Sequence, residues 1–204
     1  MARSPSRPAL LLSLAVALVA CTAARSAEVP RGDDESYPAD ITPPPGTRYP
    51  CALTALPRDL AGVPPAERAY INHTYTRILR ATQAKLVILK ALEDGAALDA
   101  ALVRYREALD PLAERLRADT PPPGLEPFQS DVVAALGLQR AFFDQAVPQR
   151  KAGQEMAALY AIPEGRQASR RLIAAFGRMQ ARYPAWSAET KDSIYHHLCA
   201  LDLF

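Results

Sequence analysis

Residues that commonly bind metals or haem are scarce in this sequence. The chain has three histidines and three cysteines, and it contains no HExxH, no cysteine pair at metal-ligand spacing and no CxxCH. His196 and His197 lie close to Cys199, but neighbours on a helix diverge by about 100° and cannot both face one ion. We therefore predict no metal site here, with one histidine at the edge of the core and the other in solvent.

Glycine is also sparse, which removes several catalytic motifs. The nine glycines are scattered singly, and some, such as Gly95 and Gly124, stand where helices are expected to end. No glycine-rich phosphate loop and no serine nucleophile elbow is present. We find no catalytic constellation and predict no catalytic residues and no cofactor.

The chain has almost no excess of either charge. It carries 24 basic and 22 acidic residues. Without the first twenty residues, which include Arg3 and Arg7 and no acid, the basic and acidic residues balance at 22 each. Nucleic-acid binding normally needs a strong positive excess to displace counterions from phosphates. Nucleic acid is therefore not an expected partner.

No apolar run near the N-terminus is long enough to span a bilayer, which needs about 20 such residues. Arg3 and Arg7 precede a shorter apolar run, ALLLSLAVALVA, as in a secretory signal. The run ends in Leu18-Val19-Ala20-Cys21, which resembles the lipobox of bacterial lipoproteins. The resemblance implies that Cys21 receives a diacylglycerol thioether and becomes the mature N-terminus. Cleavage after Ala24, giving a soluble exported protein, is the alternative.

The lipobox resemblance also implies a location. Thr22 follows the acylated position, and the lack of an aspartate there is similar to lipoproteins released to the outer membrane. We therefore expect a lipid-anchored protein of the bacterial cell envelope, in the outer membrane if the host has one.

Prolines concentrate between residues 30 and 65, where a regular helix is excluded. We predict a signal peptide over 1–20, an extended Pro-rich tether over 21–50 and a helical domain over 51–204. If Cys21 is acylated, Cys51 and Cys199 remain as an even pair in an oxidising compartment, and we predict a disulfide between them. Residues 52–63 should then pack on the domain, because their leucines would otherwise be exposed in a tether.

From Pro65 onward the apolar residues recur with helical spacing, and no strand-like alternation of any length is found. We predict an all-α antiparallel bundle of four to five helices. The expected helical ranges are 65–94, 97–118, 127–161, 164–183 and a last helix from Ser187. The second has the clearest seam, formed by Leu98, Leu102, Tyr105, Leu109, Leu112 and Leu116. In the third, the chain either kinks or turns back near Pro148.

The helix expected over 164–183 is amphipathic and basic. Its arginines are Arg166, Arg170, Arg171, Arg178 and Arg182. Such a face is either solvated or a contact for anionic membrane headgroups.

The leading hypothesis is a non-catalytic, lipid-anchored envelope protein whose bundle is a binding or scaffolding module. The alternative is a bundle that holds noncovalent haem or a small apolar ligand. Its candidate axial ligands are His73, His196, His197, Met156 and Met179. An enzyme of unrecognised type is a third hypothesis. The protein partner and the oligomeric state do not follow from the sequence.

Overall fold

The computed structural model describes residues 60–203, and all regular secondary structure in that range is helical. The prediction of an all-α protein is confirmed for these residues. The six helices are α1 (Pro65–Asp94), α2 (Leu98–Ala118), α3 (Glu126–Lys151), α4 (Met156–Leu159), α5 (Pro163–Arg182) and α6 (Ala188–Leu201).

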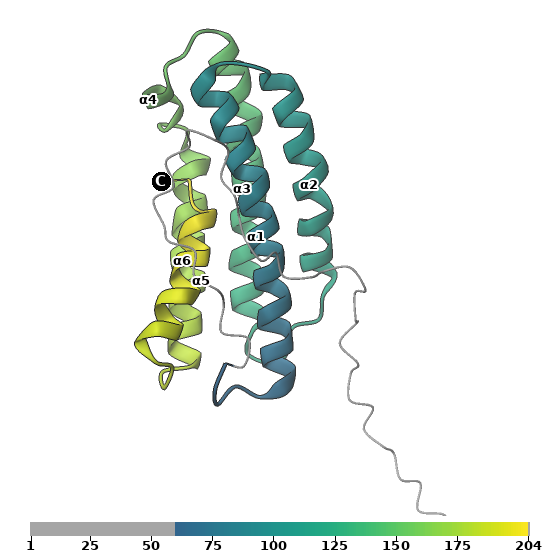
Figure 1. Ribbon diagram of the computed structural model, residues 1–204, viewed down its shortest axis with the longest axis vertical. Helices are drawn as coiled ribbons and strands as arrows, with labels where there is room; N and C mark the ends of the chain where they lie inside the picture. Colours follow the sequence, from purple (N-terminus) through teal and green to yellow (C-terminus); the bar gives the residue numbers. More distant parts are fainter. Residues whose placement is uncertain (1–59, 204) are drawn as a thin grey trace, which may run out of the picture.

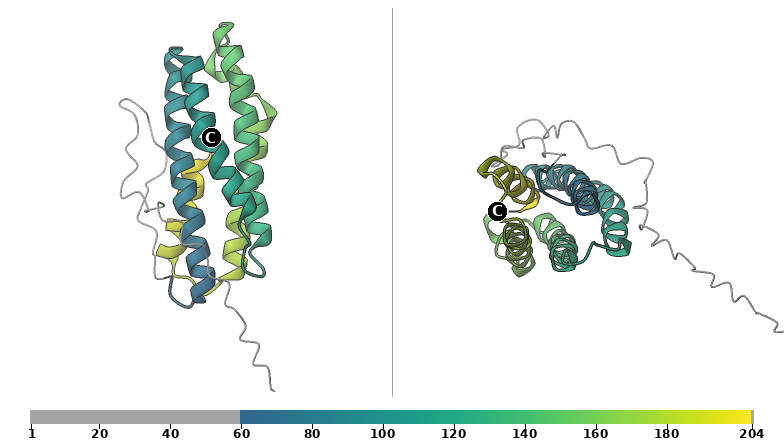
Figure 2. Two further views of the ribbon diagram at one scale, coloured as in Figure 1. Left: turned by 90° about the vertical axis from the view of Figure 1, so that its right-hand side faces the viewer. Right: turned by 90° about the horizontal axis from the view of Figure 1, so that it is seen from below.

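Five long helices form a ring around one core. Helices α1, α2, α3 and α5 run alternately up and down, and α6 runs in the same direction as α1 (Figure 1). Seen along the bundle axis, the order around the ring is α1, α2, α3, α5 and α6 (Figure 2). Helices α3 and α5 share the most extensive contact, whereas the shorter α6 fills the space between α5 and α1. The single-turn α4 lies beside α3 at one end.

The helix boundaries follow from local residue chemistry. Pro65 occupies the first turn of α1, where its missing N–H costs no helical hydrogen bond. Gly95 ends the helix in the left-handed conformation, with φ of 66°. At α6, the Ser187 hydroxyl accepts a hydrogen bond from the Thr190 N–H, as expected for an N-cap. The predicted starts and ends of these helices are confirmed to within a residue or two.

The third helical range, 127–161, is corrected by the structure. Helix α3 continues through Pro148 and ends only at Lys151. The chain then reverses through Gly153, whose φ of 91° is in the left-handed region, and forms the separate short α4 before α5 begins. Proline alone did not end the helix, since the reversal comes at the glycine that follows it.

The core lies inside the ring and is rich in aromatic residues. All six residues of the predicted α2 seam are buried. Tyr105 packs edge-on against Phe143 of α3, with ring centroids 4.7 Å apart. Trp186 is buried at the α5–α6 turn and stacks on Tyr183, with centroids 4.4 Å apart. These contacts connect the helices through the apolar faces that the helical spacing of the sequence indicates.

Residues 1–59 and Phe204 lie outside the residues that the structure describes. The predicted signal peptide, tether, Cys21, Cys51 and residues 52–59 fall in that part of the chain. Of the segment predicted to pack on the domain, residues 60–63 are described: Leu60 and Val63 are buried, whereas Ala61 and Gly62 are exposed. Over the described range, no helix has the length and apolarity needed to cross a membrane.

Candidate functional site

The two adjacent histidines of α6 occupy different environments. His197 is buried, its Nδ1 lies 2.6 Å from the Ser193 carbonyl oxygen, and its ring packs edge-on against Tyr75. Burial lowers the pKa of His197, because the charged imidazolium is disfavoured away from water. His196 is half-buried, so the two neighbours occupy different environments. The prediction of one histidine at the core edge and one in solvent is corrected, because His197 lies inside the core and His196 occupies the edge. Between residues 60 and 203, no group of three His, Cys, Asp or Glu side chains is arranged to hold a metal ion.

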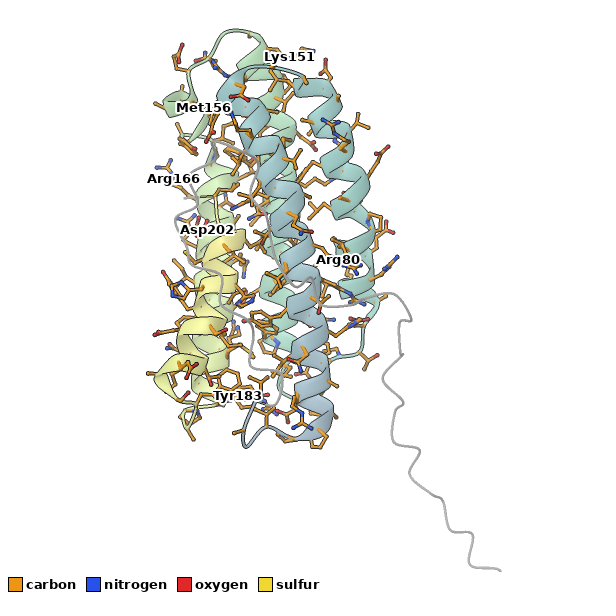
Figure 3. All side chains as sticks on the ribbon, viewed as in Figure 1. Arg80, Lys151, Met156, Arg166, Tyr183 and Asp202 are labelled. Carbon is orange, nitrogen blue, oxygen red and sulfur yellow. The ribbon has the colours of Figure 1, made fainter. Side chains whose placement is uncertain are left out.

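The other candidate haem ligands are spread over the bundle. His73 is on α1, where its Nε2 contacts the guanidinium of Arg77. Arg77 is itself buried and forms an ion pair with Asp119 at the end of α2. Met156 lies in α4 at one end of the bundle, whereas Met179 is in the last turns of α5, close to Tyr183 at the other end (Figure 3). The two methionines therefore do not share one pocket.

Cys199 is half-buried in the last turn of α6 and does not carry a free thiol. Its predicted partner, Cys51, lies outside the described residues. The pairing of these two cysteines therefore stays a prediction.

A buried lysine holds the end of α6. The Lys85 side chain, only 3% exposed, reaches from α1 and donates to the carbonyl oxygens of Ala200 at 2.6 Å and Asp202 at 2.5 Å. These carbonyls are at a helix C-terminus, where no intrahelical donor is left for them. Burial lowers the pKa of Lys85 from 10.5 to about 8, and the negative charge of Asp202 opposes this shift.

Two other helices contribute to the same cluster. Gln139 of α3 is fully buried and donates through Nε2 to the Leu201 carbonyl oxygen at 2.5 Å. Ser169 of α5 donates its hydroxyl to the carboxylate of Asp202, which lies about halfway along the bundle (Figure 3). We call Lys85, Gln139, Ser169 and Asp202 the α6 clamp. It ties the end of α6 to α1, α3 and α5.

A buried carboxylate joins α3 to α5. The side chain of Asp131 is 3% exposed, and its two oxygens accept hydrogen bonds from Arg171 Nη1 at 3.0 Å and Arg178 Nε at 2.7 Å. Both arginines are about half exposed. We call this group the Asp131 site. Two of the five arginines predicted to form one solvated or membrane-facing basic surface are therefore bound to one buried acid.

A third arginine of that face closes the lower end of the bundle. Arg182 binds Glu67 of α1, with Nη2 2.6 Å from Oε1, and it also donates to the Pro123 carbonyl oxygen. The hydrogen bond from Arg182 lowers the pKa of Glu67, because it stabilises the carboxylate. Gly124, with φ of 88°, lies against this guanidinium, and an added Cβ would be 2.4 Å from Nη1. Arg166 and Arg170 are exposed.

Two open grooves run along the outside of the bundle. One, between α1 and α2, has a volume of about 560 Å³. Its lining combines apolar side chains such as Val87 and Leu112 with charged ones, which are Arg80, Arg104, Glu107 and Arg115. The other, between α3 and α5, has a volume of about 550 Å³ and is lined by Ala134, Leu138, Gln167, Arg170, Arg171 and Ala174.

The α6 clamp and the Asp131 site were not predicted from the sequence, although a local signal existed. Lys85 continues the apolar stripe Tyr75, Ile78, Thr82 of α1 at helical spacing. Gln139 likewise falls between Leu136 and Phe143 on the buried stripe of α3. A polar side chain inside an apolar stripe indicates a buried polar contact, but the spacing does not identify its partner.

No protein-family model matches the sequence, and no curated protein and no solved structure is similar enough to count as a match. The functional argument therefore rests on the residues of this chain.

Proposed function

We propose that this protein is a lipid-anchored component of the bacterial cell envelope, in the outer membrane if the host has one, and that its helical bundle is a binding or scaffolding module. The proposal combines a lipobox-like segment at Leu18–Cys21, a Pro-rich tether over 21–50 and a helical domain. The tether would hold the bundle away from the point of acylation.

One structural observation supports the scaffolding part of the proposal. The most deeply buried charged side chains of the described helices, Lys85, Asp131 and Arg77, all bind groups on neighbouring helices. They fix helices to one another and are not gathered around a shared pocket. Such an interior favours a rigid body that presents its outer faces to partners.

The disulfide forms part of the same proposal. Pairing Cys51 with Cys199 would leave Cys21 as the single cysteine available for acylation. A loop of roughly 150 residues closed in this way stabilises the fold by about 4 to 5 kcal/mol in the chain-entropy model. Peptide mapping of the oxidised protein should recover the two segments as one linked species, and a link from Cys199 to Cys21 would contradict the proposal.

The anchor is tested by intact-mass analysis of the protein isolated from membranes. We expect the N-terminal residue to be Cys21 with the mass of attached acyl chains, and the protein to partition into detergent. Cys21→Ser should leave uncleaved precursor or a species cut elsewhere. An unmodified N-terminus at Arg25 or Glu28 in the wild type would refute the lipid anchor.

The binding module is tested by photo-crosslinking in cells. Val103 on α2 and Ile173 on α5 are large apolar residues with exposures of 50% and 65%. Photoreactive residues at these two positions sample opposite sides of the ring without disturbing the core. We expect a discrete protein adduct from at least one position, and the absence of any adduct from both would count against a binding role.

A further inference from the structure

The outer face of α5 carries a stripe that no internal contact explains. Arg166, Arg170 and Ile173 are spaced by four and three residues, which places them on one side of the helix. All three are exposed, and Ile173 is 65% exposed. Arg166 points away from the bundle (Figure 3). Ile173 therefore extends a pair of exposed arginines with an exposed apolar side chain, a combination that suits contact with an anionic membrane surface.

The groove between α3 and α5, beside this stripe, adds further N–H donors from arginine and glutamine side chains. Arg170 and Arg171 line it together with the Gln167 amide, above a floor of Ala134, Leu138 and Ala174. Among residues 60–203, no acidic side chain lines the groove. Arg171 is oriented by its bond to the buried Asp131 at 3.0 Å, which uses one of its N–H groups. A guanidinium has five N–H donors, so Arg171 keeps others for an outside ligand.

We propose that this surface, the α5 docking face formed by Arg166, Gln167, Arg170, Arg171 and Ile173, binds anionic phospholipid headgroups. Guanidinium groups bind phosphate oxygens in a bidentate manner, and the small floor of the groove leaves room for a headgroup. Ile173 inserts at the boundary between headgroups and acyl chains. The inference rests on the proposed lipid anchor, which brings the domain to such a surface.

This contact would orient the bundle on the membrane. Helix α5 lies across the ring from the pair α1 and α2 (Figure 2). With α5 against the headgroups, the groove between α1 and α2 faces away from the membrane. That groove is then the surface left open to a protein partner.

The test uses the mature chain, residues 21–204, produced without acylation as the Cys21→Ser protein, in sedimentation with lipid vesicles. Vesicles of phosphatidylcholine are compared with vesicles containing about one third phosphatidylglycerol. Each arginine near an anionic surface contributes about fivefold to binding. We therefore expect binding to the anionic vesicles only, and a loss of about twentyfold or more for Arg166→Glu/Arg170→Glu.

The matched control is Arg104→Glu/Arg117→Glu, which reverses the same number of exposed charges on α2. It should weaken binding by no more than about threefold, because charges beyond a Debye length of about 10 Å are screened. Ile173→Ser should weaken binding about fivefold without changing the charge. Arg166→Gln/Arg170→Gln serves as the milder variant, and circular dichroism verifies the fold of each protein.

Three results would overturn the docking face: equal binding to neutral vesicles, equal losses in the α5 and α2 variants, or full displacement by 10 mM inorganic phosphate, on the order of the weak affinity expected for a free anion. The last result would assign the site to a soluble phosphate. The lipid anchor is tested separately, by the mass of the protein isolated from membranes. A negative result in one experiment therefore leaves the other proposal standing.

Discussion

The bundle buries a carboxylate, Asp131, at one site and an ammonium group, Lys85, at another. The groups that compensate the two buried charges differ. At the Asp131 site, two arginines reach inward from solvent and neutralise a carboxylate that is 3% exposed. In the α6 clamp, the buried Lys85 ammonium meets uncharged carbonyl oxygens, at 2.6 and 2.5 Å, and the nearby Asp202 carboxylate bonds to Ser169 instead.

The difference shows how surface access determines the cost of a buried charge. Arginine is long enough to keep half of its side chain in water while it binds inside, so the Asp131 site remains in contact with solvent through its partners. Lys85 has no such route, and desolvation lowers its pKa to about 8 although hydrogen bonds are present. The stability that the Asp131 site contributes therefore depends on its two arginines, whereas the stability that the α6 clamp contributes depends on pH.

The largest effect should come from removing both partners of Asp131. Arg171→Gln/Arg178→Gln leaves a buried carboxylate without compensation, and we expect the free energy of unfolding to fall by about 3 to 5 kcal/mol. Urea denaturation measures the change. Adding Asp131→Asn to this variant should recover most of the loss, because the buried charge is then gone. A triple variant as unstable as the double variant would show that the uncompensated carboxylate is not the cause of the loss.

The pH dependence of Lys85 should be the next largest effect. Its pKa is about 8 in the folded protein against 10.5 for an unperturbed lysine. Between these values the unfolded chain binds more protons, so the folded state gains stability as pH rises from about 8 to 10.5. Relative to Lys85→Met, the wild type should gain up to about 3 kcal/mol over this window.

Urea midpoints of both proteins at several pH values test this prediction. Taking the difference between the two proteins cancels the groups they share. Lys90→Met, which removes a half-buried lysine paired with Asp94 on the same helix, is the control for the loss of an ammonium group from α1. A constant difference between wild type and Lys85→Met from pH 7 to 10.5 would mean that Lys85 is not desolvated.

Removing the negative charge alone should be milder than removing its partners. Asp131→Asn keeps the shape and some hydrogen bonding, and the released arginines can turn into solvent because they are half exposed. We expect a loss of about 1 to 2 kcal/mol in the free energy of unfolding. A loss equal to that of the double arginine variant would show that both sides of the site matter equally.

The smallest effect should come from the edge of the α6 clamp. Ser169→Ala removes one hydrogen bond to Asp202 and little volume, so a loss of about 1 kcal/mol is expected. Hydrogen exchange of α6 should report this loss: relative to the wild type, exchange should accelerate more near Leu198 and Leu201 than near Ile194. Uniform acceleration over α6 would indicate that Ser169 acts on the whole helix and not on its end.

The comparison also separates what local pattern can predict from what it cannot. The α2 seam and the start of the last helix at Ser187 were predicted correctly, because each depends on residues a few positions apart. The arginines of α5 were predicted as one solvated or membrane-facing set. The structure divides them, since Arg171 and Arg178 bind a residue 40 or more positions earlier in the chain.

The sequence by itself determined the class and most of the boundaries of the helices: apolar spacing, proline at first turns and glycine after last turns act within a few residues of one another. Only the tertiary structure decided which polar residues become buried partners. Lys85 and Ala200 are 115 positions apart, and Arg182 and Glu67 are equally distant. Such pairs form when the ring closes and brings helix ends and faces together, and no local periodicity carries that information.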